Sequence, residues 1–417
     1  MATVYWQGSA ARVAQVTTIA VTAYDAATTY KITVGDQVIS VIGSGGTTTT
    51  VAAALVAAWN AATHDYCTGI TATNNTNTVS LTADNAGTPF VVTSSVSGGT
   101  GTIGSATTAT ASAGPNDWST AGNWSGGAVP VNSDDVIIKD SAISILWGLA
   151  QSAVALTSLR IEKTFTGKIG LDRAVFTTTY DGATTVSTKT EYRATYLAIS
   201  ATTVKIGENY AGASVNGSAR ILIDLGSTAA TVEVFGTASA ASESGRPAIR
   251  LKANSASTDI FVRSAPGGVG VAIDTPGETS TIRKVSVSDT TTSSKVLTGS
   301  GVTLTTWEQL GGTNFLQAAA TVATETVSGG VLSVEGDFTI TAATISGGTV
   351  YENHIKTGGS AITTLTMNGG TIDAQGSTRA RTWDTVALNA GTLKSPGSAL
   401  TITTKTLKTS AFTMVIS

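Results

Sequence analysis

The sequence predicts a mainly β protein, in which a small N-terminal α+β domain with one helix precedes a right-handed parallel β-helix of about 20-residue coils. Three observations favour this fold class. Apolar and polar residues alternate with period two in short stretches, glycine-rich turns separate these stretches, and a six-residue pattern recurs near the C-terminus. Charged residues make up 12% of the 417 positions and hydrophobic residues 41%, which excludes a chain disordered by its own charge.

The predicted N-terminal domain covers residues 1–95. Period-two alternation over Gln15–Val21 and Tyr30–Val41 indicates strands. A run of threonines then offers an N-cap for a helix over Val51–Ala62, where the apolar side chains fall on one face. Residues 1–113 carry six of the 51 charged side chains of the chain, and low charge is typical of the core of an interface. This domain is therefore our candidate docking module.

Residues 96–113 consist almost entirely of Gly, Ser, Thr and Ala. Such a composition buries little apolar surface, so we expect a linker here. The remaining residues, 114–417, are predicted to form a cap followed by the solenoid. Trp118 and Trp124 lie at the start of this part, and two tryptophans so close in sequence are suited to covering the open end of a solenoid core.

A repeated pattern of apolar residues around paired small residues supports the solenoid. It begins at Val327, Ile345, Met367 and Leu388, so that successive copies are offset by 18, 22 and 21 residues. A period near 20 is typical of stacked β-coils, in which each coil pairs with the next. The turn glycines of the pattern are Gly329, Gly330, Gly347, Gly348, Gly369, Gly370 and Gly391.

The sequence lacks the serine-hydrolase and P-loop motifs of common enzyme classes. The two histidines, His64 and His354, fall in different segments, and no Gly-x-Ser-x-Gly sequence surrounds a serine. Gly167 and Lys168 lack the earlier glycine and the following Ser or Thr of a P-loop. The sequence therefore predicts no enzyme, no catalytic residue and no cofactor.

Two groups of side chains have the types that bind metals. His64, Asp65 and Cys67 lie within four residues, which more often marks a helix end meeting solvent than a metal site. Asp134, Asp135 and Asp140 are candidate calcium ligands, but the nonapeptide repeat of calcium-binding β-rolls is absent. We expect no metal at either place.

The net charge and hydropathy of the chain limit the kinds of partner that the sequence predicts. The net charge is −3 and no Lys/Arg-rich run occurs, so nucleic acid and anionic membrane surfaces are not expected partners. No stretch of 18 apolar residues occurs. A secretory signal is not visible at the N-terminus, and the single cysteine, Cys67, forms no intrachain disulfide.

The Trp-containing segment resembles known proteins. The run from Trp118 to Ile138, with Asn123-Trp124-Ser125-Gly126-Gly127 and Asp134-Asp135-Val136-Ile137-Ile138, resembles the opening coils of β-solenoids from bacteriophage virions and bacterial surfaces. The first part, ending in Ala86-Gly87-Thr88-Pro89-Phe90-Val91-Val92-Thr93, resembles a small domain of phage structural proteins. The resemblance implies a virion component made in the host cytoplasm, either a capsid decoration protein or part of a tail fibre.

Three hypotheses follow. The first is a non-enzymatic decoration protein that binds the major capsid protein, or other virion proteins, as a homo-oligomer such as a trimer. The second is a tail fibre or spike that binds a host glycan, with the C-terminal strands Leu400–Ile416 supporting a trimer and scattered aromatics contacting sugar rings. The third is a polysaccharide-degrading enzyme, which needs carboxylates meeting on one face. The scattered aromatics are Tyr180, Tyr192, Tyr196, Tyr210, Trp307 and Trp383.

The third hypothesis depends on the stretch with the most charged residues, Arg160–Arg193. Acidic and basic side chains alternate there at irregular spacing. Such a mixture is more typical of a solvated face than of an active site.

Overall fold

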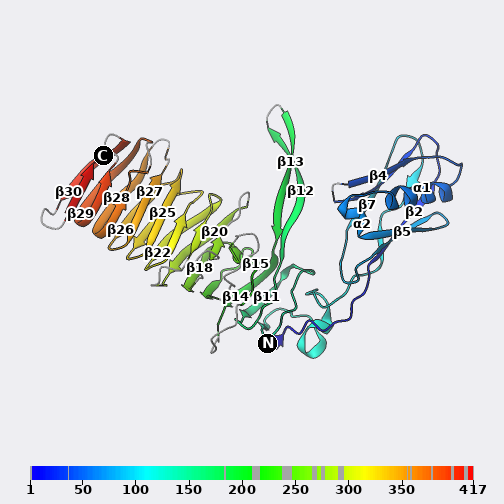
Figure 1. The fold of residues 1–417 in the computed structure, drawn as a ribbon, viewed down its shortest axis with the longest axis horizontal. Coiled ribbons are helices and arrows are strands. Elements are labelled where there is room, and N and C mark those ends of the chain that lie inside the picture. The colour runs from blue at the N-terminus through cyan, green and yellow to red at the C-terminus, as the bar shows by residue number, and fades with distance from the viewer. Residues whose placement is uncertain are drawn as a thin grey trace.

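The computed structural model describes residues 2–35, 37–182, 185–208, 217–236, 247–264, 270–273, 278–289, 295–354, 356, 359–376, 379–395, 399–407 and 412–416. The fold is mainly β, with 57% strand and 7% helix, and contains a parallel β-solenoid of about 10 turns. Figure 1 shows the solenoid strands stacked along the long axis, with an N-terminal body beyond the first coils.

Two antiparallel sheets and a helix make up the N-terminal body. One sheet has the order β5-β6-β2-β8, with β9 also paired to β2, and the other has the order β4-β3-β7. The strands are β2 (Val16–Ala23), β3 (Thr29–Val34), β4 (Gln37–Ile42), β5 (Ile70–Asn75), β6 (Thr78–Ala83), β7 (Val92–Ser97), β8 (Thr102–Ile103) and β9 (Thr107–Thr110). The predicted strand over Tyr30–Val41 is thus a hairpin, because Gly35 turns the chain at a φ of 57°.

Helix α1 (Thr48–Asn60) packs against β2, β4 and β5. Its N-cap is Thr47, whose hydroxyl accepts a hydrogen bond from the backbone N–H of Thr50, and this satisfies one of the free donors of the first turn. The buried face carries Val51, Leu55 and Trp59. A second helix, α2 (Asp65–Thr68), follows directly.

The residues expected to form a linker, 96–113, are instead part of the body. Strands β8 and β9 lie in this stretch and pair antiparallel with β2, and the backbone N–H of Val13 donates to Ala113 O. Backbone pairing requires no large side chains, so the Gly/Ser/Thr composition did not reveal these strands.

The start of the chain belongs to the solenoid. Strand β1 (Thr3–Tyr5) pairs in parallel with β10 (Asp135–Ile138), which pairs in turn with β11 (Ala150–Ile161). The predicted N-terminal domain, residues 1–95, therefore begins after β1 rather than at residue 1. The N-terminal body is inserted between β1 and β10, so both of its chain connections lead to the first coils of the solenoid.

The later coils alternate between two stacks of parallel strands. In the first stack each strand pairs with the next in the order β14-β16-β18-β20-β22-β24-β26-β28-β29-β30. The strands of this stack are β14 (Leu197–Ile206), β16 (Thr231–Phe235), β18 (Asn254–Ser264), β20 (Ser280–Val287), β22 (Val302–Gln309), β24 (Val322–Val327), β26 (Ile340–Ile345), β28 (Ser360–Asp373), β29 (Arg381–Ser395) and β30 (Leu400–Leu407).

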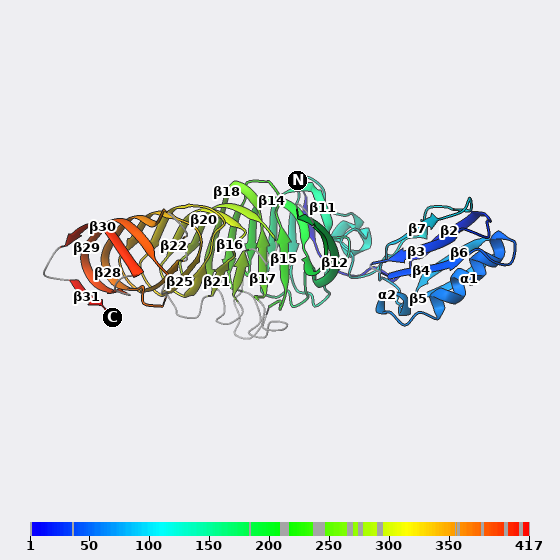
Figure 2. The same cartoon turned by 90° about the horizontal axis from the view of Figure 1, so that it is seen from above.

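The second stack ends in β31, which pairs with β29. Long strands β28 and β29 contribute to both stacks. The strands of this stack are β15 (Ile221–Asp224), β17 (Ile249–Lys252), β19 (Val271–Ile273), β21 (Val296–Thr298), β23 (Thr313–Leu316), β25 (Val331–Gly336), β27 (Thr349–His354) and β31 (Phe412–Ile416). Figure 2 shows the coils along the axis.

The core of the solenoid is a set of inward columns in which equivalent residues of successive coils stack. The repeated pattern supplies one column, in which Val327, Ile345, Met367 and Leu388 pair in register and are all buried. The repeats predicted from sequence are thus successive coils.

Coils are about 22 residues apart rather than 20, and they number about 10 rather than the 14 that the shorter period predicts for residues 131–417. Insertions between the early strands account for the difference. Leu159 pairs with Val204, 45 residues later, because an antiparallel hairpin of β12 (Leu171–Gly182) and β13 (Thr185–Thr195) lies between them. In Figure 1 this hairpin projects from the first coils.

Candidate functional site

The N-terminal end of the solenoid is covered by three tryptophans. The ring centroid of Trp124 lies 4.5 Å from that of Trp118 and 5.0 Å from that of Trp6, both in edge-to-face geometry. The indole N–H of Trp124 donates to Trp118 O at 2.7 Å. All three side chains are buried, and they join the solenoid core. The short helices η1 (Ala121–Asn123) and η2 (Ser125–Gly127) hold this segment in place.

Trp118 and Trp124 are the pair that the sequence predicts as a cap, whereas Trp6 was not predicted. Trp6 is 112 residues earlier in the chain than Trp118, and only the pairing of β1 with β10 brings it to this end. The isolated bridge between Trp6 and Trp124 shows the same link in the backbone.

The acidic residues near this end have structural partners. The Asp134 carboxylate accepts hydrogen bonds from the backbone N–H groups of Ala2 and Val131, and these bonds lower the pKa of Asp134. Asp135 accepts a hydrogen bond from the Ser158 hydroxyl, and Asp140 lies beside Lys139. The aspartates therefore anchor β1 and the first coils.

The predicted turn glycines form a ladder. Gly330, Gly348, Gly370 and Gly391 have positive φ angles between 73° and 103°, and Gly329, Gly347 and Gly369 precede three of them. A Cβ atom added at Gly348 would lie 2.5 Å from Gly330 O, in the coil below. The ladder thus meets two demands, a left-handed backbone and close approach of adjacent coils.

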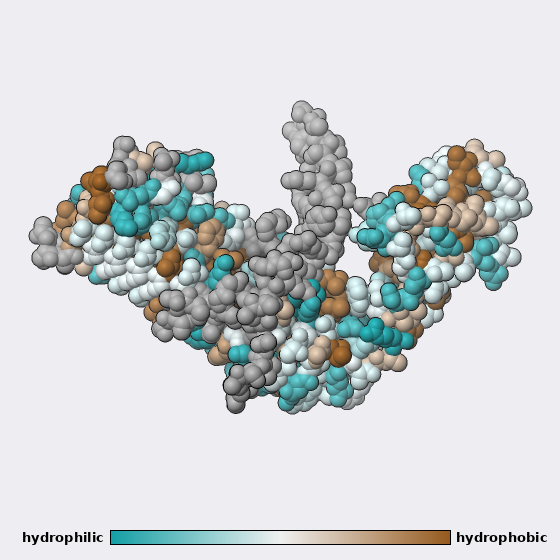
Figure 3. All heavy atoms as spheres, in the orientation of Figure 1, coloured by the Kyte–Doolittle hydropathy of each residue, from teal (hydrophilic) through white to brown (hydrophobic). Residues whose placement is uncertain are grey.

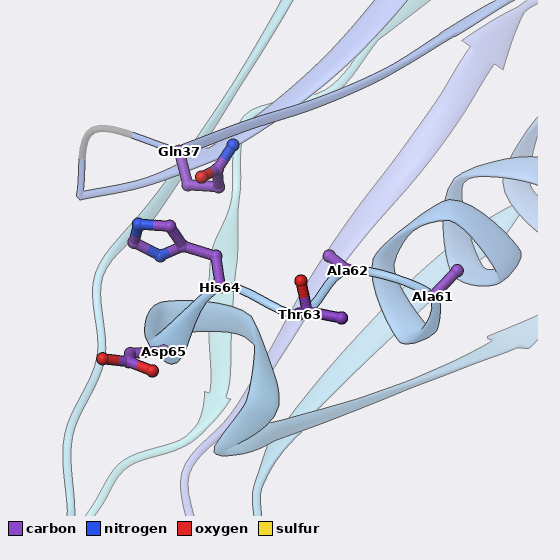
Figure 4. Close-up of a pocket in the computed structure, with 6 residues that line it drawn as sticks. All are labelled: Gln37, Ala61, Ala62, Thr63, His64 and Asp65. Atoms are coloured by element: carbon purple, nitrogen blue, oxygen red, sulfur yellow. The ribbon is translucent and has the colours of Figure 1, made fainter.

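The residues His64, Asp65 and Cys67 do not converge. His64 is the N-cap of α2, and its Nδ1 accepts a hydrogen bond from the backbone N–H of Tyr66 at 3.3 Å. Cys67 is buried in the N-terminal body, and this burial raises the pKa of its thiol. The surface hollow beside His64 is lined by Gln37, Ala61, Ala62, Thr63, His64 and Asp65. In Figure 4 the His64 ring is directed toward Gln37 and the Asp65 carboxylate away from it.

The charged stretch beginning at Arg160 contributes to a strip of ion pairs across the first coils. Arg160 Nε lies 3.1 Å from Glu208 Oε2, and Lys205 Nζ lies 2.6 Å from Glu208 Oε1. Glu233 pairs with Arg263 at 3.2 Å. These partly exposed pairs link strands on the outside of the solenoid. The side chains of residues 172–193 lie outside the described part of the chain.

Two of the candidate sugar-stacking aromatics lie inside the solenoid. Trp307 and Trp383 are fully buried, and Tyr196 is 8% exposed. Tyr210 and the side chains of Tyr180 and Tyr192 lie outside the described residues. These three aromatics are therefore not exposed for contact with a sugar, which weakens the glycan-binding hypothesis.

A buried ionisable cluster, which the sequence did not predict, occupies the interior of the later coils. It consists of Glu325 on β24, Glu352 and His354 on β27, and Arg381 at the start of β29. Each is at most 4% exposed. The register places Glu325 between Trp307 and Ala343 in an inward column, at a position that is apolar in most coils. Only the stacking of the coils brings these distant residues together.

Glu352 is the centre of this cluster. Its Oε1 lies 2.7 Å from His354 Nδ1 and 3.8 Å from Arg381 Nε. Arg381 also donates from Nη2 to the backbone oxygens of Glu352 and Ala374. The Phe338 ring covers His354 in edge-to-face geometry, with a centroid separation of 4.5 Å. The charges are therefore paired and hydrogen-bonded, as buried charges must be to persist.

The two carboxyl groups of the cluster differ in protonation. Burial raises the pKa of Glu325 to about 8, and the neighbouring charge of Glu352 adds to the effect. Burial alone would also raise the pKa of Glu352, but His354 and Arg381 outweigh it and hold the pKa below its usual value. Near neutral pH Glu352 is thus ionised, whereas Glu325 is mostly protonated.

Glu325 and Glu352 line one small cavity with apolar side chains around it. Its volume is about 10 Å³, measured as the space open to the centre of a water molecule, which is room for roughly one water. Glu325 Oε2 has no hydrogen-bond partner among the described residues. A cavity of this size in a closed core does not admit a substrate, so the cluster is suited to structure rather than to catalysis.

Among the described residues, no group of three or more His, Cys, Asp or Glu side chains has a geometry that could hold a metal ion. No helix in the described ranges has the length and hydropathy to cross a membrane. The chain matches no family model, and comparisons with curated proteins and with solved structures find no match. The fold therefore defines the class, a parallel β-solenoid protein with an inserted N-terminal body.

Proposed function

We propose that the chain is a non-enzymatic structural protein of a bacteriophage virion, a capsid decoration protein that binds the major capsid protein shell and stabilises it. The small N-terminal α+β body is the docking module, and the solenoid extends from it. Such binding requires an interface that is stabilised by the burial of apolar surface rather than by pairs of opposite charges. One surface of the body is suited to this.

This surface, the docking face, is the outer side of the β4-β3-β7 sheet. Val38 is 46% exposed and Ile42 66% exposed, both on the edge strand β4. Val91, just before β7, is 80% exposed. Around them lie Thr and Ser side chains of β3 and β7, with Lys31 between. The register places Ile42 and Val91 at opposite ends of this sheet, with Val38 between them along the strands, so the exposed apolar side chains are spread over one face that carries little charge. An exposed face of this composition favours an interaction site.

The solenoid surface differs from this face. Figure 3 shows the visible side of the later coils as mostly pale or teal, with isolated brown residues, whereas brown atoms gather on the N-terminal body. The solenoid is closed at one end by Trp6, Trp118 and Trp124, beside the two connections of the body. This arrangement supports a rigid element held to a shell through its body.

An add-back experiment tests the proposal. Particles from cells in which the reading frame of this chain is disrupted are mixed with the purified protein, and binding is measured by co-sedimentation. The wild-type protein should bind and restore resistance to heat or osmotic shock. A Val38→Lys/Ile42→Lys variant should lose at least tenfold in affinity, whereas Val131→Lys, an equally exposed position outside the body, should not. Particles of unchanged resistance that adsorb poorly to cells would overturn the proposal.

A second candidate function is a tail fibre or spike. Strand β31 favours it, because Met414, Val415 and Ile416 are 37%, 43% and 65% exposed on the last described coil. Exposed apolar strands at a fibre end are suited to association between three copies. Loss of adsorption without loss of particle stability would support this alternative.

A further inference from the structure

The small cavity inside the later coils is closed to solvent. Apart from Glu325 and Glu352, its lining consists of Val, Ile, Leu and Ala side chains of the solenoid core, each at most 3% exposed. Its volume of about 10 Å³ is therefore an internal space, separate from the surface of the solenoid. The two glutamates supply the polar side chains of its wall.

Glu325 enters this cavity from β24 and lacks a partner there. It occupies a core position at which the next two coils carry Ala343 and Leu365. The side chain is buried, and its Oε2 has no hydrogen-bond partner among the described residues. Buried polar atoms in folded proteins are nearly always hydrogen-bonded, because an unpaired one has lost its hydration without compensation. A partner for Oε2 is therefore expected in the space that Glu325 faces.

Glu352 faces the same space from β27, in the following coil. Its Oε1 lies 2.7 Å from His354 Nδ1, and its Oε2 accepts a hydrogen bond from the backbone N–H of His354 at 3.3 Å. An ionised carboxylate has about four acceptor positions, so Glu352 can accept a further hydrogen bond. The raised pKa of Glu325, caused by burial and by the charge of Glu352, leaves an O–H on Glu325 to donate near neutral pH.

A water molecule fits both the size and the chemistry of this space. An internal water needs about 10–15 Å³ of such space and two to four polar partners. Here it accepts the O–H of Glu325 and donates to the carboxylate of Glu352. A metal ion fits less well, since the described residues provide no group of three or more His, Cys, Asp or Glu side chains suited to one.

We propose that this cavity is a binding site for one ordered water molecule, which accepts a hydrogen bond from the Glu325 carboxyl and donates one to the Glu352 carboxylate. The water joins Glu325 to the contacts of Glu352 with His354 and Arg381. A continuous polar chain then links three coils through the core, those that contain β24, β27 and β29. This water site does not depend on the virion role, since it needs only the solenoid.

The main competing arrangement is a direct contact between Glu325 and Trp307. Trp307 pairs in register with Glu325 from the preceding coil, and its indole N–H is also buried without a partner among the described residues. A Glu325 carboxyl turned toward this N–H would leave the cavity with Glu352 as its single polar side chain. A cavity with one polar partner does not hold a water. The two arrangements thus differ in one carboxyl orientation and in one water.

A crystal structure of the full chain, at a resolution that shows ordered waters and at slightly acidic pH, tests the proposal. The wild type should show one water at about 2.5–3.2 Å from an oxygen of Glu325 and from an oxygen of Glu352. Glu325→Gln retains a hydrogen-bond donor and should keep the water. Glu325→Leu leaves the water a single polar partner, and the water should be absent.

Oxygen-17 magnetic relaxation dispersion measures the same difference in solution, because it counts waters that remain inside a protein. Glu325→Leu should hold one long-lived water fewer than the wild type, and Glu325→Gln the same number. Glu335→Leu, at a partly exposed glutamate on β25, is the matched control and should leave the count unchanged. Thermal unfolding establishes that each variant is folded, and Glu325→Met replaces Glu325→Leu if the latter is not.

Four results overturn the proposal. They are a dry cavity in the wild type, a Glu325 carboxyl bonded to Trp307, a cation in place of the water, and an unchanged water count in folded Glu325→Leu.

Discussion

His354 Nδ1 lies 2.7 Å from Glu352 Oε1 inside the solenoid, and both side chains are at most 2% exposed. A buried carboxylate is retained only where neighbouring groups compensate its lost hydration. His354 and Arg381 do so for Glu352, whereas Glu325 has only a protonated state in which to remain buried. The interior of the later coils therefore carries a pH dependence that the surface does not reveal.

The first prediction concerns Glu325. The pKa of a carboxyl in an unfolded chain is near 4.3, and in the fold that of Glu325 is about 8. Between these values the folded state holds a proton that the unfolded state has lost, so the stability of the solenoid falls as pH rises from about 5 to 8 and is level above that. The contribution is on the order of 3–5 kcal/mol over this range.

Glu325→Gln should remove most of this decline. The free energy of unfolding is measured in denaturant at several pH values by tryptophan fluorescence, to which Trp307 in the adjacent coil contributes. Glu335→Gln, a partly exposed glutamate on β25, controls for the loss of a carboxyl group. A decline in Glu325→Gln equal to that of the wild type would assign the titration to another group.

The second prediction concerns Arg381, whose side chain is fully buried. Arg381→Met leaves the Glu352 carboxylate with one compensating partner fewer and frees the backbone oxygen of Ala374. Removing one partner of a buried ion pair costs about 3–5 kcal/mol. Lys394→Met, which breaks a partly exposed pair with Asp373, should cost no more than about 1 kcal/mol in the same unfolding experiment. Equal costs would mean that the buried cluster contributes little to stability.

The third prediction separates two roles of a turn glycine. Gly348 and Gly359 have nearly equal φ angles, 74° and 73°, but an added Cβ meets Gly330 O at Gly348 and nothing within 4 Å at Gly359. Gly359→Ala should therefore cost about 1–2 kcal/mol, the strain of a left-handed residue. Gly348→Ala should cost clearly more, because adjacent coils must also separate. Similar losses of unfolding free energy for the two variants would refute the contact role.

The fourth prediction concerns the cap. Trp124→Ala removes the ring between Trp6 and Trp118 together with its hydrogen bond to Trp118 O. Truncating a buried tryptophan costs about 3–5 kcal/mol, and here the loss falls on the open end of a stack. Hydrogen exchange should speed up first in β1, β10 and β11, while β26 and β28 keep their protection. Uniform loss of protection along the solenoid would argue against a local cap.

Local sequence patterns predict the stacked coils and the tryptophan pair but not every strand. The offsets between Val327, Ile345, Met367 and Leu388 predicted stacked coils, because each coil repeats the same inward and turn positions. Trp118 and Trp124 could also be predicted as a pair, because they are close in the chain. Strands β8 and β9 were missed, because β8 has two residues and β9 only Thr and Ala, which carry no periodic signal, and both are held by backbone pairing to β2.

The long-range features could not be predicted from one sequence. Trp6 joins the cap only because β1 pairs with β10 across the inserted body. Glu352 and Arg381 lie in strands that also carry polar or charged residues, and their neighbours in sequence do not indicate an inward orientation. A weak signal existed in Glu325, which occupies the position that is apolar in the neighbouring coils at Ala343 and Leu365.

The position of the chain on intact particles decides whether it is a capsid decoration protein. Intact virions are labelled with antibody fragments against the purified protein and imaged by electron microscopy, with particles from the disrupted reading frame as the control. If the chain is a capsid decoration protein, label is distributed over the head and absent from the control. Label confined to the tail, or no label on intact particles, would contradict it.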